Sequence, residues 1–173
     1  MNPVKLIRHR GDYTHMAYKG YFKEGKLKEG YTHYWRAGDG GFNISEYKKA
    51  LNEIRKIVKA NSKILAGGDG EGLPEISKDI VFNGKGEEGS SETFYLPANP
   101  SKLGAFNFTK TARRPYDIVV TACLSVLKHF CPSIEVDSDG GSKGMTSGIK
   151  LAKKITGLDI KNPVSDNNQD DVF

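Results

Sequence analysis

A short polar segment near the middle of the chain combines residue types that bind anions. Arg113 and Arg114 stand directly before Pro115, and Lys110 lies upstream of them. Proline favours an extended backbone at the preceding residue and suits the first turn of a helix, so we predict a helix from about residue 115. Unpaired backbone N–H groups and the positive end of the helix dipole would then lie beside the guanidinium groups. The segment therefore predicts a phosphate site.

The same arginines have two other interpretations. In the structural one, Arg113 and Arg114 pair with internal acids and form a buried network that fixes the architecture without chemistry. In the catalytic one, acids act as general acids, bases or metal ligands, and the arginines clamp a phosphorylated or nucleotide substrate. The acids concerned are Glu92, Asp117, Asp137 and Asp139, of which Asp117 serves the structural interpretation alone. Since no established catalytic motif is present, we assign no catalytic residue, metal ligand or cofactor.

The N-terminal third of the chain is basic and rich in aromatic residues. Residues 1–63 carry fourteen lysines and arginines against six acids, whereas residues 64–163 balance to zero. Aromatic rings interleaved with cations on strands can stack bases of single-stranded nucleic acid, although such rings commonly pack a sheet onto the core. We therefore expect a non-catalytic protein that binds RNA or single-stranded DNA. The residues that we predict to contact nucleic acid are Lys23, Lys26, Lys28, Tyr31, Tyr34, Trp35, Arg36, Lys110, Arg113 and Arg114.

The four histidines are scattered along the chain. Tyr-Thr-His occurs twice, at 13–15 and 31–33, whereas phosphoesterases with paired histidines carry the order His-x-Thr. We interpret the repeat as two similar strands that face each other. His129 is expected near the end of a helix, where a positive charge is favourable. The histidines are therefore assigned no catalytic role.

Three helices are expected to position these segments. Asn43 is a good N-cap, with Phe42 and Tyr47 spaced as a hydrophobic staple around the helix start. A second helix, at about 115–131, is apolar almost all round, which is typical of a central, buried helix. It carries both cysteines, about 12 Å apart along the axis, so we expect buried free thiols. Ser142 is expected to cap the last helix, which ends near Gly157.

Several segments alternate between apolar and polar residues as strands do. They lie at residues 79–82, 92–96, 106–109 and 134–136, and Asn83-Gly84 is a strong signal for a hairpin turn. The prediction is an α+β fold, with an antiparallel sheet packed on two or three helices. Residues 1–162 would form a single domain, within which residues 1–41 are basic and aromatic. Residues 163–173 would form a polar, acidic and disordered tail.

Several short motifs resemble those of a family of small uncharacterised proteins of tailed bacteriophages. They are Gly70-x-Gly72-x-Pro74, Phe82-Asn83-Gly84 followed by Glu92-Thr93-Phe94, and Lys110-Thr111-x-Arg113-Arg114-Pro115-Tyr116-Asp117. Ser91 stands where family members often carry a histidine. The resemblance implies a phage origin and one compact domain, and it supplies no activity. Because no membrane-length apolar run or signal peptide is evident, we expect the cytoplasm of an infected host, no membrane partner, and a phage or host protein as the alternative to nucleic acid.

Overall fold

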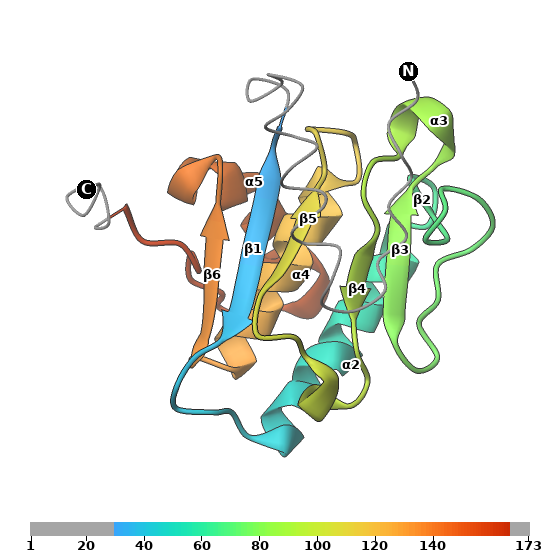
Figure 1. The fold of residues 1–173 in the computed structure, drawn as a ribbon. Coiled ribbons are helices and arrows are strands. Elements are labelled where there is room, and N and C mark those ends of the chain that lie inside the picture. Colours follow the sequence, from blue (N-terminus) through green and yellow to red (C-terminus); the bar gives the residue numbers. More distant parts are fainter. Residues whose placement is uncertain (1–29, 167–173) are drawn as a thin grey trace.

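The structure is a computed structural model, and residues 30–166 of it are described (Figure 1). Its strands are β1 (Thr32–Ala37), β2 (Leu65–Ala66), β3 (Ile80–Gly84), β4 (Phe94–Leu96), β5 (Asn107–Lys110) and β6 (Ile134–Ser138). Its helices are α2 (Ile44–Ala60), α3 (Gly86–Gly89), α4 (Asp117–Phe130) and α5 (Gly141–Thr156), with a 3-10 turn at Pro100–Lys102. The predicted α+β class is confirmed. Among the helices described, none is long and apolar enough to cross a membrane.

The strands of residues 30–166 divide into two antiparallel sheets. The first sheet has the order β5-β1-β6, and the second has the order β2-β3-β4. Strand β5 does not pair with β4, which precedes it in the sequence, but with β1, far away in the sequence. The two sheets are connected between β4 and β5. The backbone N–H of Glu92, just before β4, donates to the carbonyl of Lys110, the last residue of β5, at 3.1 Å. Figure 1 shows α4 and α5 behind the first sheet.

Helix α4 is the central buried helix that its apolar sequence predicts. Nine consecutive residues, 119–127, are buried. The helix begins at Asp117, two residues later than Pro115, because the chain first makes a tight turn in which Ala112 and Arg113 have φ of 52° and 58°. Helix α5 approaches α4 closely at Gly148, where an added Cβ would lie 2.0 Å from Thr121 Oγ1. The first sheet and α5 therefore pack around a largely apolar helix.

The helix ends follow local sequence signals in some cases and not in others. Asn43 caps α2 by accepting from two backbone N–H groups, and the ring of Phe42 stacks on Tyr47 at 5.4 Å. Gly157 ends α5 with φ of 72°, as predicted. Ser142 does not cap α5 and instead lies in its first turn. The cap position belongs to Gly140, since the chain already enters helical geometry at the following residue.

Two predicted irregular segments are ordered. Asn83 and Gly84 do not form a hairpin turn but are the last two residues of β3, where the buried side chain of Asn83 donates to the carbonyls of Gly68 and Ser91. The chain instead reverses direction between β3 and β4 through α3. Residues 163–166 do not belong to a disordered tail, because Val164 is buried and Asp166 accepts hydrogen bonds from the amide and hydroxyl of Ser142. The rest of the predicted tail lies outside the described residues.

Both cysteines are buried free thiols, as their helical spacing predicted. Cys123 lies within α4, and Cys131 follows its last residue. Burial raises the pKa of both thiols, that of Cys131 to about 11. Both are therefore protonated at neutral pH, as expected of packing residues rather than reactive thiols.

Candidate functional sites on the two faces of the first sheet

Strand β1 places side chains of different character on the two faces of the first sheet. Successive side chains of a strand point to opposite faces. His33 and Trp35 face the helices and are buried, whereas Tyr34 and Arg36 lie on the opposite face. We call the helix-covered side the inner face and the opposite side the outer face. Each face carries a separate group of residues that could have a function.

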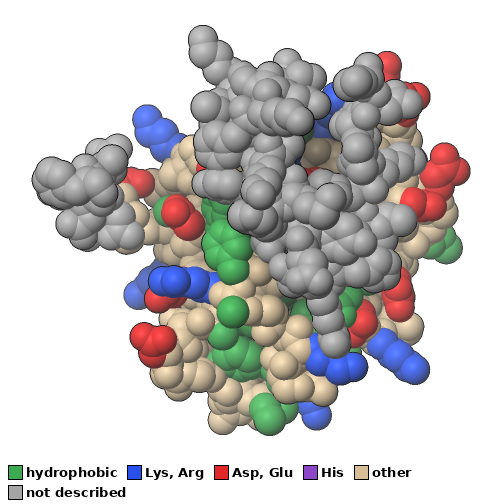
Figure 2. Space-filling view, viewed as in Figure 1, with side chains coloured by type: hydrophobic (Ala, Val, Ile, Leu, Met, Phe, Trp, Pro, Cys, Tyr) green, Lys and Arg blue, Asp and Glu red, His purple; other side chains and the backbone are tan. Residues whose placement is uncertain are grey.

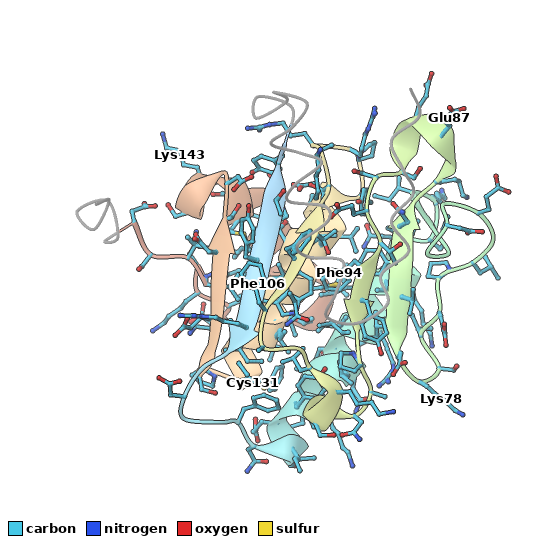
Figure 3. The ribbon with its side chains drawn as sticks, viewed as in Figure 1. Lys78, Glu87, Phe94, Phe106, Cys131 and Lys143 are labelled. Atoms are coloured by element: carbon cyan, nitrogen blue, oxygen red, sulfur yellow. The ribbon has the colours of Figure 1, made fainter. Side chains whose placement is uncertain are left out.

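The outer face carries an aromatic cluster, defined here as Tyr34, Phe106 and Phe108. Cross-strand pairing of Tyr34 with Phe108 brings the rings together, with centroids 5.9 to 6.5 Å apart. Phe108 is buried, whereas Phe106 keeps 48% of its surface exposed (Figure 3). Tilted rings at these separations attract one another. The rings of Tyr34 and Phe108 therefore hold the exposed ring of Phe106 in a fixed position.

Charges of opposite sign flank the aromatic cluster. Along β6, Glu135 and Asp137 pair in register with Arg36 and Tyr34 of the outer face. Arg36 forms an exposed ion pair with Glu135. On the other side, β5 ends at Lys110, which lies opposite Thr32. Figure 2 shows blue and red side chains interspersed with green ones around this face. The β6 side is thus acidic, and the β5 side leads into the basic joint, residues 110–114.

The structural interpretation of the basic joint is wrong. Among the described residues, neither Arg113 nor Arg114 forms an ion pair, and both are exposed. Arg113 instead lies over the ring of Tyr31, with its guanidinium carbon 4.0 Å from the centroid. The acids that we considered have other partners: Glu92 and Asp139 accept from backbone amides of Lys110 and Thr32, and Asp117 contacts His33. The arginines are therefore presented to solvent.

The predicted nucleic-acid residues are only partly brought together. Lys23, Lys26 and Lys28 lie outside the described residues. Trp35 is 1% exposed, with its ring 5.3 Å from Phe94 in the core, and Tyr31 is 6% exposed. A base cannot stack on an enclosed ring, so both assignments are corrected. The structure leaves Tyr34, Arg36, Lys110, Arg113 and Arg114 on the outer face or at its edge.

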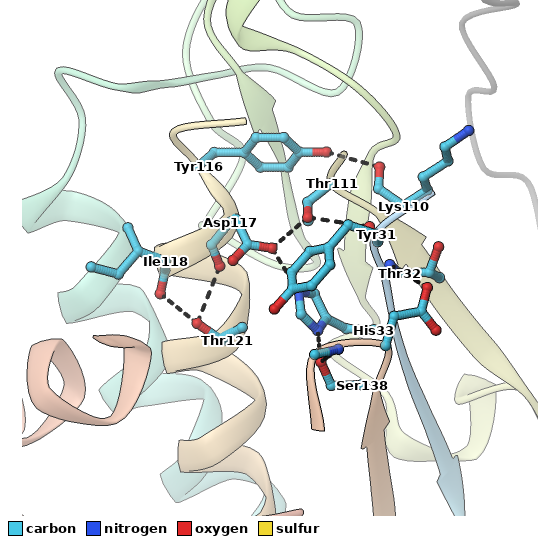
Figure 4. Close-up of polar contacts among 12 residues, drawn as sticks. Tyr31, Thr32, His33, Lys110, Thr111, Tyr116, Asp117, Ile118, Thr121 and Ser138 are labelled. Carbon is cyan, nitrogen blue, oxygen red and sulfur yellow. Dashed lines mark hydrogen bonds and ion pairs between the residues drawn. The ribbon is translucent and has the colours of Figure 1, made fainter. Parts of the chain in front are cut away.

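The inner face carries a hydrogen-bonded group of a serine, a histidine and an aspartate (Figure 4). His33 Nδ1 lies 2.9 Å from Ser138 Oγ, and His33 Nε2 lies 2.6 Å from Asp117 Oδ1. Ser138 ends β6 directly opposite His33, and Asp117 is the first residue of α4. His33 is fully buried, and Ser138 retains 7% of its surface. Three distant elements thus meet at one imidazole.

The partners of Asp117 set the direction of the hydrogen bonds in this group. Its Oδ1 also accepts from the hydroxyl of Thr111, and a carboxylate in the first turn of α4 complements the helix dipole. A carboxylate accepts, so Nε2 of His33 donates to Asp117. In the tautomer that carries its proton on Nε2 alone, Nδ1 is an acceptor and Ser138 donates its hydroxyl proton to it. The serine oxygen also accepts from the backbone N–H of Gly140 at 3.1 Å.

Tyr31 covers the Ser138–His33–Asp117 group on the side that faces the basic joint. Its ring meets His33 edge-on at 5.1 Å, and its hydroxyl is hydrogen-bonded to Ser138. Burial, followed by the charge of Asp117, raises the pKa of Tyr31, so the phenol is protonated at neutral pH. An added Cβ at Gly140 or Gly144 would lie 2.1 or 2.3 Å from the phenol oxygen. The two glycines therefore form a recess that the hydroxyl occupies.

Comparison with known proteins adds no assignment to either face. No family model, curated protein or solved structure matches the chain. Within residues 30–166, no group of three or more His, Cys, Asp or Glu residues is placed to hold a metal ion. The two sites are therefore interpreted from their own geometry.

Sequence reasoning missed the most important residue of each face. Phe106 was used only to predict a strand, and its alternation with Phe108 signalled that the two rings share a face. His33 was interpreted as part of a repeated strand, and Ser138 was assigned no role. Nothing in the local sequence places these two residues opposite each other, since the register of β1 and β6 does so.

Proposed function

We propose that the protein binds single-stranded nucleic acid, RNA or DNA, across the outer face of the first sheet. The observation that carries this proposal is exposed Phe106, seated on Tyr34 and Phe108 beside the basic joint. Every base has an aromatic face, and stacking on a protein ring contributes roughly 1–3 kcal/mol per base. Bases paired within a duplex do not offer that face, so single strands are favoured.

The distribution of charge sets the expected path of the strand. On the β6 side Glu135 is paired with Arg36 and Asp137 repels phosphates, whereas Lys110, Arg113 and Arg114 attract them. The phosphate backbone would therefore follow β5 toward the basic joint, with its bases turned onto the aromatic cluster. Exposed Arg113 and Arg114 can each form charge-assisted hydrogen bonds to phosphate oxygens.

The proposal is tested by fluorescence anisotropy on the full chain with labelled single-stranded RNA, single-stranded DNA and duplex DNA. We expect tighter binding of single strands, with a logarithmic affinity that falls by about 0.7 per contacted phosphate for each logarithmic unit of salt. Equal binding of the duplex, or no binding to any of the three at low salt, would contradict the proposal.

Matched variants separate the two contributions. Phe106→Ala should weaken binding roughly fivefold or more, the effect of losing about 1 kcal/mol of stacking, whereas Leu73→Ala removes another exposed apolar side chain as a control. Arg113→Ala combined with Arg114→Ala should weaken binding and lower the salt dependence. Lys150→Ala combined with Lys154→Ala removes the same charge from exposed positions on α5. If the paired variants behave alike, binding depends on net charge and not on the outer face.

A further inference from the structure

The Ser138–His33–Asp117 group makes no use of the outer face. Its three side chains are connected in the order serine, imidazole, carboxylate, which is the order by which hydrolases activate a serine when the imidazole carries its proton on the carboxylate side. The imidazole is turned relative to the chymotrypsin arrangement, because Nδ1 faces the serine and Nε2 faces the aspartate. Either ring nitrogen can accept the serine proton, since the other keeps its N–H on the carboxylate.

A purely structural network would account for the same three contacts, because they join β1, β6 and α4. Two further observations point to chemistry. Ser138 is the last residue of a strand, followed by Asp139, Gly140 and helix α5, which begins at Gly141. Its oxygen also adjoins the glycine recess, where a Cβ on Gly144 would lie 3.2 Å from Ser138 Oγ. Close approach to the serine is therefore possible from the side that Tyr31 occupies.

The phenol oxygen of Tyr31 marks the place that a substrate oxygen would take. It lies against Gly140 and Gly144, at the amino end of α5. The helix dipole favours developing negative charge at this end, as an oxyanion requires. The Tyr31 backbone is held by the amides of Thr111 and Ala112. Opening therefore requires rotation of the Tyr31 side chain and displacement of Arg113, an exposed residue.

We propose that Ser138, His33 and Asp117 form a serine-nucleophile site that hydrolyses carboxylic esters and that the Tyr31 hydroxyl closes in this conformation. Arg113 and Arg114 beside the entrance favour an ester that carries an anionic group. The reacting residues lie on the inner face, so Ser138→Ala separates this proposal from the proposed nucleic-acid binding, although both proposals use Arg113 and Arg114.

In each half of the reaction His33 accepts one proton and then donates it. Ser138 Oγ attacks the carbonyl carbon while its proton passes to His33 Nδ1, and the imidazolium stays paired with Asp117. The tetrahedral intermediate collapses with cleavage of the ester C–O bond, and the leaving alkoxide takes the proton from Nδ1. Water then attacks the acyl-serine and gives a proton to Nδ1, which returns it to Ser138 as the acid leaves. The net reaction converts ester and water to acid and alcohol.

The test is covalent labelling of the full chain with a fluorophosphonate probe, mapped by peptide mass spectrometry, together with hydrolysis of 4-nitrophenyl acetate and mono-4-nitrophenyl succinate. We expect labelling at Ser138 and faster hydrolysis of the succinate ester. Tyr31→Phe, which keeps the ring and removes the hydroxyl, should accelerate labelling about fivefold, as expected for loss of one hydrogen bond. His33→Gln should slow it about 10²-fold or more, and Ser138→Ala should abolish it.

A control variant and measurements of folding show whether a change in labelling arises at Ser138. Ser147→Ala removes an exposed serine of α5 and should leave labelling unchanged. Circular dichroism and thermal melting establish which variants are folded. If the unsubstituted chain and Tyr31→Phe are folded but neither is labelled at Ser138, or if hydrolysis persists in Ser138→Ala, the proposal is overturned and the network is structural alone. Binding of single strands by Ser138→Ala would be unchanged in every case, which separates this test from that of the outer face.

Discussion

Each face of the first sheet carries residues that depart from the usual distribution of buried apolar and exposed polar side chains. On the outer face, Phe106 is exposed beside Tyr34, whereas the inner face encloses His33 and Ser138. Buried polar groups and exposed aromatic rings are each more informative than the reverse arrangement. Since one strand, β1, supplies both Tyr34 and His33, the contrast arises from the alternation of a single strand.

The contrast shows that the two faces are subject to different physical requirements. The inner face must satisfy every polar atom that it buries, because an unsatisfied buried group costs about 1–3 kcal/mol. The outer face has no such requirement, because half-exposed Phe106 and the exposed charged side chains of this face are in contact with solvent. Substitutions of inner-face residues should therefore lower stability more than substitutions of outer-face residues, which should affect mainly binding. Four predictions test that contrast, from the largest effect to the smallest.

The largest difference is expected between two aromatic residues. Trp35→Ala should lower the free energy of unfolding by about 3–5 kcal/mol, because it opens a cavity next to Phe94. Phe106→Ala should lower it by less than about 1 kcal/mol, because that ring is half exposed. Urea denaturation followed by far-ultraviolet circular dichroism, which does not depend on the tryptophan, measures both. Similar losses would show that Phe106 is a packing residue, and the contrast between the faces would fail.

A second comparison uses polar residues of β1. His33→Ala leaves Asp117 and Ser138 without the imidazole, and we expect a loss of about 2–3 kcal/mol. Arg36→Ala on the outer face breaks an exposed ion pair and should change stability by about 0.5 kcal/mol or less. The same denaturation experiment applies. A loss for Arg36→Ala equal to that for His33→Ala would refute the assignment of stability to the inner face.

Local patterns predicted the elements that depend on neighbouring residues. The apolar run after Asp117 predicted the central helix, and Asn43 predicted the start of α2. They could not predict which face each β1 side chain occupies, because a shift of one residue in register exchanges the faces. Tyr34 and Trp35 are adjacent aromatic residues on opposite faces of β1. The pairing of β1 with β5 and β6 decides which of the two is buried.

The candidate sites were predicted less completely than the fold for the same reason. The basic joint is continuous in sequence and was found, whereas Ser138 and His33 are 105 residues apart. Each was visible only as an isolated polar residue on a strand. The ordering of residues 163–166 likewise depends on Ser142, a contact distant in sequence. Long-range pairing, and not local propensity, is what the sequence alone left open.

A third prediction concerns the layer behind the inner face. Gly148→Ala places a Cβ 2.6 Å from the backbone nitrogen of Ala122 as well as against Thr121, so α4 and α5 must separate. We expect a loss of about 1–3 kcal/mol from overpacking, despite the higher helix propensity of alanine. Ser147→Ala, one residue earlier and exposed, should be neutral or slightly stabilising. If thermal melting shows Gly148→Ala to be the more stable variant, the close approach of the two helices is incorrect.

The smallest effect is expected at the acidic side of the first sheet. Desolvation raises the pKa of Asp139, although the amide of Thr32 opposes the shift. A carboxyl whose pKa is raised on folding contributes stability below its unfolded pKa and loses it as pH rises through the folded pKa. Asp139→Asn should therefore raise the melting temperature slightly at pH 7, and the gain should disappear as pH falls below about 3.8, the ordinary value.

The same substitution also tests the outer face. Removing a negative charge from the end of β6 should strengthen binding of single strands at low salt, and the gain should fade at high salt, where charges are screened. Asp159→Asn removes an equal charge at an exposed position after α5 and serves as the control. Equal gains from the two variants would show that only net charge matters. A gain confined to Asp139→Asn would place the phosphates beside the first sheet, as its opposed acidic and basic sides require.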